Sequence, residues 1–377
     1  MSVAIEEKVI NILVKLTRFP VIPSIPKREK WYRLPLTGCV CADGRPAHAD
    51  LRLGTENKLL IMFFGGGVCW NAYMAARPNS TAVNGTDESF YATGDSADVA
   101  DAAVRFGFGP LSKKKSNPFR NWNMLAIPYT TGDFHCGSGD FPYTTLEGKP
   151  AVLHHHGYKI YRASLESAMR IIGSEPKQLL VTGFSAGGFG TALLTDDVMR
   201  TFPRCTDVTC YVDSGFMLNP GWHHVAKAVW QTPAVIADRL RTNNITLDSL
   251  LALYQNHKDR VKIGFSCSVR DAALAEYVNY VEKDKLYADK ASGIAFQKQL
   301  KAMCAQLQSN IPGVSLFLFD TPDENEEKRA QGLTKHCVLG AENIVTDGIS
   351  AAAWLWDLVC GKPSQRGLPL LDQVVDS

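Results

Sequence analysis

This sequence has almost no net charge and lacks long apolar runs. The 377 residues include 40 Lys and Arg against 38 Asp and Glu, which gives a net charge of +2. Neither sign forms a long block, and the short run Lys113-Lys114-Lys115 is typical of a solvated loop. We therefore expect no nucleic-acid partner. Because no stretch of about 18 apolar residues occurs, we also expect no transmembrane segment.

The N-terminus lacks the pattern of a secretory leader. Residues 9–16 are apolar but are interrupted by Lys15 and preceded by Glu6-Glu7-Lys8. A leader has an unbroken apolar stretch after a basic start. The spacing of the apolar residues instead predicts a short amphipathic helix. On this ground the default expectation is a cytoplasmic protein.

Ten cysteines are many for a cytoplasmic enzyme, so secretion stays open as the alternative. Cys205 and Cys210 bracket a short segment and are candidates for a disulfide. Cys39 and Cys41 are separated by one residue, which is too few for an ordinary zinc knuckle.

The sequence also lacks a set of residues with metal-site spacing. His154-His155-His156 are adjacent, and three adjacent side chains cannot all point at one ion from regular structure. No cysteine or carboxylate shares a metal-site spacing with them. We therefore expect no metal and no other cofactor.

Short apolar runs that end at Gly, Pro or Asp alternate with helical patterns. Six runs predict buried strands, at residues 59–64, 124–128, 179–182, 210–212, 261–265 and 314–319. Apolar spacing predicts helices over 161–172 and 274–281, and a buried terminal helix over 349–359. This alternation predicts an α/β fold with a mostly parallel central sheet and helices on both faces. Because we find no repeat and no second domain boundary, we expect one domain over residues 1–377.

Residues 71–121 break this rhythm. The stretch is rich in Gly, Ser, Asn and Asp and shows little periodicity. A loop of this length in a compact domain is usually functional or disordered. We interpret it as a cap or active-site insertion over the site, and a passive surface insertion is the alternative.

The segment Gly183-Phe184-Ser185-Ala186-Gly187 follows the predicted strand 179–182. It fits the G-x-S-x-G nucleophile elbow, in which a sharp strand-to-helix turn exposes the serine hydroxyl. Ser185 is therefore the candidate nucleophile. The alternative is a glycine-rich turn with a passive serine.

A glycine run follows the predicted strand 59–64. In esterases, such a loop turns backbone N–H groups toward the oxyanion that forms during acyl transfer. The expected donors are the N–H groups of Gly66, Gly67 and Ala186, although Phe64 stands where such loops carry His. The alternative is a tight turn that requires positive φ.

The nucleophile, acid and base follow in that chain order in this class of enzyme. His336 is the only histidine after His257 and lies in a loop after the last predicted strand, so it is the candidate base. Three aspartates follow strands and could orient it. From position we rank Asp271 first, Asp213 second and Asp320 third, and Asp213 could instead cap a turn.

Polar residues also follow other predicted strands. Asp133 and His135 come after strand 124–128, and Trp222, His223 and His224 come after the Asp213 loop. Both groups are candidates for the rim of a substrate pocket. The alternative, which we slightly favour, is that they are loop residues whose polar atoms bond within the protein.

Together these motifs resemble the pectin acetylesterase family. Five segments carry the resemblance, in the family's order: 41–46, 65–70, 117–135, 183–188 and 213–215. The resemblance implies an α/β-hydrolase that removes acyl groups by a Ser/Asp/His mechanism without a metal. It implies the roles of nucleophile for Ser185, acid for Asp271 and base for His336, and it adds Trp70 to Asp133 and His135 as candidate substrate-binding residues. The chain departs from plant members at Val68 and Thr130, where they have Trp and Cys.

We therefore expect a serine carboxylesterase, foremost a deacetylase, that acts on a small-molecule or glycan ester. Relatives act on acetylated polysaccharide and on a fatty-acylated protein, so the resemblance indicates less about the substrate than about the reaction. One alternative is a hydrolase of longer acyl esters or polyesters. Another, from a different class, is a catalytically silent hydrolase fold that binds a glycan or a protein.

Overall fold

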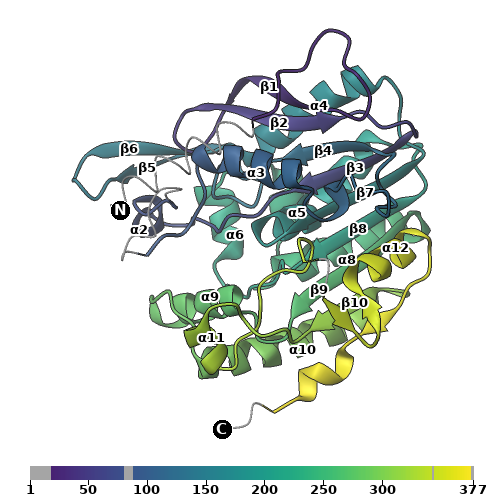
Figure 1. Cartoon of the computed structure of the whole chain (residues 1–377). Coiled ribbons are helices and arrows are strands. Elements are labelled where there is room, and N and C mark those ends of the chain that lie inside the picture. The colour runs from purple at the N-terminus through teal and green to yellow at the C-terminus, as the bar shows by residue number, and fades with distance from the viewer. Residues whose placement is uncertain (1–17, 80–87, 342–343, 375–377) are drawn as a thin grey trace, which may run out of the picture. The chain divides into compact units, whose positions relative to one another are not determined.

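The computed structural model describes residues 18–79, 88–341 and 344–374 (Figure 1). By its internal contacts, the chain divides into two compact units. Unit 1 comprises Met1–Leu179 and His224–Ala237, and unit 2 comprises Leu180–His223 and Asp238–Ser377. The amphipathic helix predicted at residues 9–16 lies outside the described residues.

In unit 1, the strands β1, β2, β4 and β3 lie side by side in that order. Strands β1–β2 and β2–β4 pair antiparallel, whereas β3 and β4 pair parallel. The apolar runs predicted at 59–64 and 124–128 form β3 and β4, whose residues are nearly all buried. The strand bounds are Trp31–Val40 for β1, Pro46–Arg52 for β2, Lys58–Phe63 for β3 and Asn123–Ile127 for β4.

Helix α4 (Gly157–Ile172) packs against β1, β2 and β4. Tyr161, Leu165 and Ala168, whose helical spacing contributed to its prediction, are buried in it. A separate antiparallel hairpin, β5 (Gly139–Thr144) and β6 (Pro150–His155), extends away from the four-stranded part of unit 1 (Figure 1). The returning segment of unit 1 adds a π-helical turn at Val225–Val229 and helix α7 at Ala234–Ala237.

The stretch 71–121 contains more regular structure than its composition suggests. Its helix α3 has one buried face and is tied to β1 and β2, because Asp101 forms ion pairs with Arg33 and His48. Its role as a cap stays a prediction. The elements of this stretch are α2 (Ala72–Ala75), α3 (Asp95–Phe106) and a 3-10 turn at Gly109–Leu111.

Unit 2 contains the strand order β7-β8-β9-β10-β13, and β7 begins just before the unit boundary. Strands β8–β9, β9–β10 and β10–β13 pair parallel. The four predicted strands of this region are confirmed, and β13 is an addition. The bounds are Gln178–Phe184 for β7, Val208–Asp213 for β8, Val261–Ser268 for β9, Ser315–Phe319 for β10 and Gln365–Arg366 for β13.

Helices of unit 2 cover these strands. α5 packs on β8 and α8, α10 packs on α8 and α9, and α12 packs on β8, β9 and β10. The remaining elements are short. The bounds are Ala186–Thr201 for α5, Trp222–His224 for α6, Ile245–His257 for α8, Lys258–Arg260 for η3, Ala272–Lys283 for α9, Lys290–Asn310 for α10, Glu326–Ala330 for α11, Val345–Thr346 for β11, Ile349–Ser350 for β12, Ala351–Val359 for α12 and Leu368–Asp372 for η4.

The helix predicted at 349–359 is confirmed as α12, but it is buried on one face only. Trp354, Leu355 and Leu358 are buried, whereas Ala352 and Ala353 are exposed. The small alanines made the segment apolar all round without burying it all round. It is not the last element, because β13 and η4 follow.

The structure confirms the predicted α/β class, with parallel strands and surrounding helices. The ten cysteines form no disulfide, so the candidate pairing of Cys205 with Cys210 is not observed. Cys205 Sγ instead lies 3.7 Å from the Asp207 carbonyl, and Cys210 Sγ accepts from Thr195 at 3.4 Å. Within the described ranges, no helix is both long and apolar enough to cross a membrane.

Candidate active site

Ser185 occupies a sharp turn between β7 and α5 in unit 2. Its backbone has φ 54° and ψ −128°, a strained conformation for a residue with a Cβ, and its side chain is partly exposed. The Ser185 N–H donates to the Asp213 carbonyl at 2.9 Å. Ala186 is the first residue of α5, so its N–H has no acceptor within the helix. This is the geometry that the G-x-S-x-G pattern predicts.

Two glycines let the serine turn pack closely against the end of β8. A Cβ on Gly188 would lie 2.5 Å from the Asp213 carbonyl oxygen. A Cβ on Gly215 would lie 2.7 Å from the backbone at Gly188 and Phe189. Any side chain at either position would push the turn away from β8.

His336 and Asp271 are hydrogen-bonded to each other within unit 2. The distances from His336 Nδ1 to Asp271 Oδ1 and Oδ2 are 2.9 and 2.7 Å. Asp271 is fully buried and caps α9, where its Oδ1 accepts from the N–H groups of Ala273 and Leu274 at 3.1 and 3.0 Å. His336 is 24% exposed through its side chain. The two backbone N–H groups of α9 therefore fix the Asp271 carboxylate, and the carboxylate bonds to Nδ1 of the His336 ring, which reaches the surface of the unit.

The charge of this pair shifts the pKa of the histidine. Burial opposes the imidazolium form, but the Asp271 carboxylate outweighs burial and raises the pKa of His336 above its usual value. The buried carboxylate of Asp213 adds to this effect. The two carboxylates would therefore stabilise the imidazolium that forms when His336 takes up a proton.

Hydrogen bonds of Thr334 connect the loop that carries His336, called the histidine loop below, to the segment that carries Asp271. Its N–H donates to the Arg270 carbonyl, and its carbonyl accepts from the Ala272 N–H, both at 2.9 Å. Its hydroxyl donates to Ser268 Oγ at 2.9 Å and accepts from the Arg270 N–H at 3.0 Å. Because Thr334 lies two residues before His336, these bonds fix the ring relative to its carboxylate.

Asp213 holds the other side of the histidine loop. Its Oδ2 accepts from the N–H groups of Val338 and Leu339 at 2.9 and 2.7 Å. Its Oδ1 accepts from the hydroxyls of Ser266 and Ser214 at 2.9 and 3.1 Å. Burial raises the pKa of Asp213 despite these bonds. Asp213 therefore joins two loops: its carbonyl binds the Ser185 N–H, and its carboxylate binds the backbone just after His336.

Of the three aspartates considered for the acid, Asp271 bonds to the imidazole. Asp213 uses its carboxylate on backbone amides and hydroxyls, and Asp320 is exposed at the end of β10. Sequence reasoning ranked Asp271 first, but it did not foresee the positioning role of Asp213 or the connecting role of Thr334. No local pattern signals those roles, because Thr334 lies 64 residues from Arg270 and Asp213 lies 126 residues from Leu339.

The glycine run lies in unit 1, where it pairs with residues 90–92. Gly67 has φ +76°, and a Cβ there would lie 1.9 Å from the Phe90 carbonyl oxygen. The Val68 N–H donates to Phe90, and the Ala92 N–H donates to the Gly66 carbonyl, at 2.7 and 2.8 Å. The tight-turn interpretation therefore applies to Gly67. The donor role of Gly66 and Gly67 stays a prediction.

Asp133 and His135 are buried inside unit 1. Asp133 accepts from the N–H groups of His135 and Gly157 at 3.0 and 2.8 Å, and burial raises its pKa to about 6. His135 Nε2 lies 2.9 Å from the carbonyl of Phe64, and burial lowers its pKa to about 4. They support the loop that precedes the glycine run, which matches the alternative of internally bonded residues. Their contact with substrate stays a prediction.

The remaining rim candidates differ in exposure. Trp70 is half-buried directly after the glycine run. Trp222 is fully buried, and its indole N–H donates to a backbone carbonyl at 3.1 Å. His223 and His224 are exposed. Trp222 is therefore an internally bonded residue, like Asp133 and His135, and Trp70 stays a candidate.

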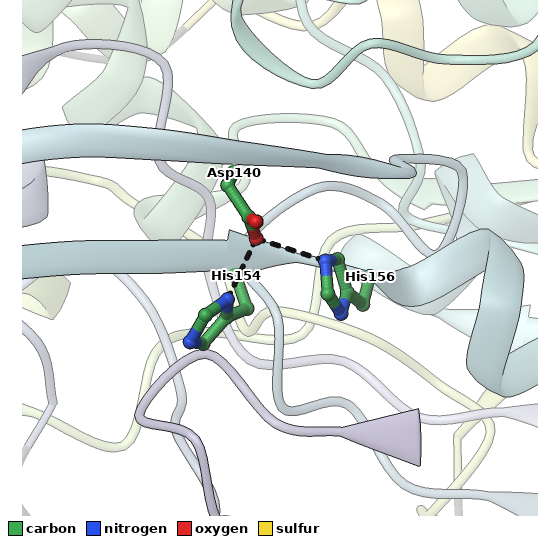
Figure 2. A group of neighbouring side chains, drawn as sticks. All are labelled: Asp140, His154 and His156. Atoms are coloured by element: carbon green, nitrogen blue, oxygen red, sulfur yellow. Dashed lines mark hydrogen bonds and ion pairs between the residues drawn. The ribbon is translucent and has the colours of Figure 1, made fainter. Parts of the chain in front are cut away.

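Two clusters of His and Asp side chains lie in unit 1. Ligand atoms within each cluster lie within 4.8 Å of one another, and the clusters are Asp140, His154 and His156, and His48, Asp50 and Asp101. The first is drawn in Figure 2. Asp140 was not among the residues expected near the three adjacent histidines, because a partner fourteen residues away on the other strand of a hairpin has no recognisable metal-site spacing.

A sequence model of the family described as Pectinacetylesterase matches residues 33–245, more than half of the chain. The chain belongs to the pectinacetylesterase family. The family match includes Ser185 and Asp213 but ends before Asp271 and His336. The arrangement of those two residues therefore comes from the structure.

Among pectinacetylesterase relatives, pectin acetylesterase 11 of Arabidopsis thaliana is 27% identical over 188 residues, which cover 48% of this chain and 44% of the relative. Pectin acetylesterase 4 of the same plant is 29% identical over 187 residues, which cover 48% of this chain and 42% of the relative. The chain thus aligns with less than half the length of these curated relatives.

The solved structure of the Wnt deacylase Notum from Drosophila matches 88% of this chain and 94% of its own chain. The TM-score is 0.55 and the sequence identity is 18%. This likeness shows the fold. The pectinacetylesterase family member described here therefore has the predicted α/β-hydrolase-like fold.

Proposed function

We propose that this chain is a serine carboxylesterase that hydrolyses an acetyl ester through Ser185, His336 and Asp271. Family membership supports the class of reaction, since the matched relatives are named pectin acetylesterases. The observation that carries the proposal is the Asp271–His336 pair, in the same unit as a strained serine at a strand-to-helix turn.

Asp213 gives this proposal its geometric support. The serine turn and the histidine loop both bond to this one residue. An ester hydrolase needs a nucleophile and a base held by a rigid framework. The shared anchor is what such a framework requires.

In the acylation half of the reaction, Ser185 Oγ attacks the ester carbonyl carbon while His336 Nε2 takes its proton. Asp271 keeps the Nδ1 proton on its own side of the ring and stabilises the imidazolium. The tetrahedral intermediate collapses, the bond to the alcohol oxygen breaks, and His336 returns the proton to that oxygen. The acyl group stays on Ser185.

In the second half, His336 takes a proton from water, and the resulting hydroxide attacks the acyl carbon. Collapse breaks the bond to Ser185 Oγ, which regains the proton from His336, and the carboxylic acid leaves. The Ala186 N–H is the oxyanion donor that we assign in unit 2. The sequence predicts Gly66 and Gly67 as further donors, and each donor typically lowers the barrier by about 3 kcal/mol.

The test compares wild type with Ser185→Ala on p-nitrophenyl acetate. The variant should lose at least about 10⁴-fold in kcat/KM with an unchanged Tm. Ser309→Ala is a matched control, because Ser309 is exposed on α10, and it should behave as wild type. Activity in Ser185→Ala close to that of wild type would refute the nucleophile.

Acetate release from a panel of acetylated glycans and simple esters identifies the substrate class. Rates on C2, C4, C8 and C16 esters separate a deacetylase from a hydrolase of longer acyl groups. We expect the C2 ester to be hydrolysed fastest and the rate to fall as the acyl chain lengthens. A fluorophosphonate probe should label wild type at Ser185, and absence of labelling would favour a silent binding fold.

A further inference from the structure

The β5–β6 hairpin of unit 1 brings three ligand-type side chains to one side. Asp140 on β5 pairs directly opposite His154 on β6. His156, the N-cap of α4, comes two residues after His154, and its ring also lies beside Asp140. His155 points away and is buried, with its Nδ1 2.9 Å from the Thr131 carbonyl. Figure 2 shows both flanking rings facing the Asp140 carboxylate.

One carboxylate oxygen serves both rings. Asp140 Oδ1 lies 2.6 Å from His154 Nδ1 and 3.0 Å from His156 Nε2. The side chains of Asp140, His154 and His156 are 58%, 28% and 11% exposed. The cluster is therefore anchored on one side and open to solvent at the carboxylate.

The backbone that carries the two rings is held in place. The His154 N–H donates to the Ala42 carbonyl at 3.1 Å, and the His156 N–H donates to the His154 carbonyl at 2.9 Å. The next residue, Gly157, donates to buried Asp133 at 2.8 Å. A ligand would thus meet two imidazoles whose separation is already set.

His156 Nε2 has two neighbours with opposite requirements. The Asp140 carboxylate can accept a hydrogen bond from His156 Nε2 only when that nitrogen carries a proton. The Lys159 ammonium, whose Nζ lies 3.0 Å from His156 Nε2, can donate a hydrogen bond only when that nitrogen has a free lone pair. A neutral ring nitrogen cannot satisfy both. A cation, the Lys159 ammonium, therefore already lies beside this nitrogen. A carboxylate and a ring lone pair together favour a positive charge at that position.

We propose that Asp140, His154 and His156 form a binding site for a divalent transition-metal ion of the Zn²⁺ class. The ligands are His154 Nδ1, His156 Nε2 and a carboxylate oxygen of Asp140, with water in the open fourth position. Two imidazoles and one carboxylate suit Zn²⁺, Ni²⁺ or Cu²⁺ rather than Mg²⁺ or Ca²⁺. The ion takes the place of the protons between Asp140 and the rings and displaces the Lys159 ammonium.

The required movement is small. Tetrahedral bonds of about 2.0–2.2 Å place neighbouring ligand atoms roughly 3.3 Å apart. The separations of 2.6 and 3.0 Å between Asp140 and the two rings therefore open by less than about 1 Å, and the two ring nitrogens, which lie within 4.8 Å of each other, close by at most about 1.5 Å. Bound metal would tie β5, β6 and the start of α4 together. No step of the proposed ester hydrolysis passes through this site, so the two proposals fail independently.

The experiment titrates tag-free, chelator-treated full-length protein with Zn²⁺ by calorimetry and records Tm with and without Zn²⁺. Wild type should bind one ion and gain Tm. His154→Ala/His156→Ala should lose both effects, and Asp140→Asn, an exposed change that spares the fold, should weaken binding. Lys159→Gln should bind several-fold more tightly, because the competing ammonium is gone.

Exposed His224 lies outside the cluster, so His224→Ala serves as the matched control and should bind as wild type does. Co²⁺ in place of Zn²⁺ should give wild type, but not the double variant, the visible absorption of a tetrahedral site. Wild type that binds no more Zn²⁺ than the double variant or Asp140→Asn would overturn the site. Equal affinity for Mg²⁺ would overturn the metal class, and unchanged affinity in Lys159→Gln would overturn the displacement of the lysine.

Discussion

At the scale of single residues, Asp271 and Asp213 differ in what they bond, so their isosteric substitutions should separate catalysis from stability. Asp271→Asn should lower kcat on p-nitrophenyl acetate by about 10⁴-fold, because the amide favours the wrong ring tautomer. Asp213→Asn presents an amide NH₂ to backbone donors, so it should lower Tm and lower kcat less. Parallel kcat and Tm measurements check this. Our assignment of the acid fails if only Asp213→Asn loses activity while its Tm is unchanged.

The same pair sets the pH dependence of the reaction. His336 must be neutral to act as a base, and Asp271 raises the pKa of His336. The acid limb of kcat/KM should therefore lie above about pH 6.5, the value for a free imidazole. Activity is lost as pH falls through the raised pKa. The residual activity of Asp271→Asn should show this limb at lower pH, and an unmoved limb would mean that another group titrates.

At the scale of elements, the attachment of α3 to β1 and β2 contains a buried carboxyl pair. Asp50 is fully buried, and neither oxygen has a hydrogen-bond donor. Burial first, and the neighbouring Asp101 carboxylate second, raise the pKa of Asp50 well above its usual value. Folded Asp50 therefore keeps a proton that the unfolded chain releases above about pH 4. Stability from this group is lost as pH rises toward the folded pKa.

Asp50→Asn should remove that loss, since the amide needs no proton and can donate to Asp101. We expect its Tm to exceed that of wild type by about 2 °C or more at pH 8, with the gap closing toward pH 4. Asp101→Asn is the control and should lose stability, because Asp101 also binds Arg33 and His48. A gap that does not change with pH would contradict the protonated state of Asp50.

The elements that could be predicted are those with a strong local signal. All six apolar runs became strands because central parallel strands are buried on both faces. The strands β1, β2, β5 and β6 were missed, since each contains or begins with proline, a residue that is rare in central strands. Helix α3 was missed because alanines and an aspartate form most of its buried face. The candidate triad was predictable from chain order, but the contacts that hold it join residues far apart in sequence.

At the scale of the whole molecule, the chain should carry ten free thiols. Thiol titration in denaturant without reductant should count ten, and reductant should leave the Tm unchanged. In the native protein only exposed Cys360 should react fast, and half-buried Cys337 slowly, since the other eight are buried. Cys360→Ser should remove the fast phase. A count below ten would show that disulfides form.

The double use of Asp213 has a mechanical consequence. A single peptide unit and its side chain set the spacing between the nucleophile turn and the histidine loop, so neither can drift alone. A change in the backbone at Val338 or Leu339, which are not among the reacting residues, should therefore shift the position of Ser185 through Asp213.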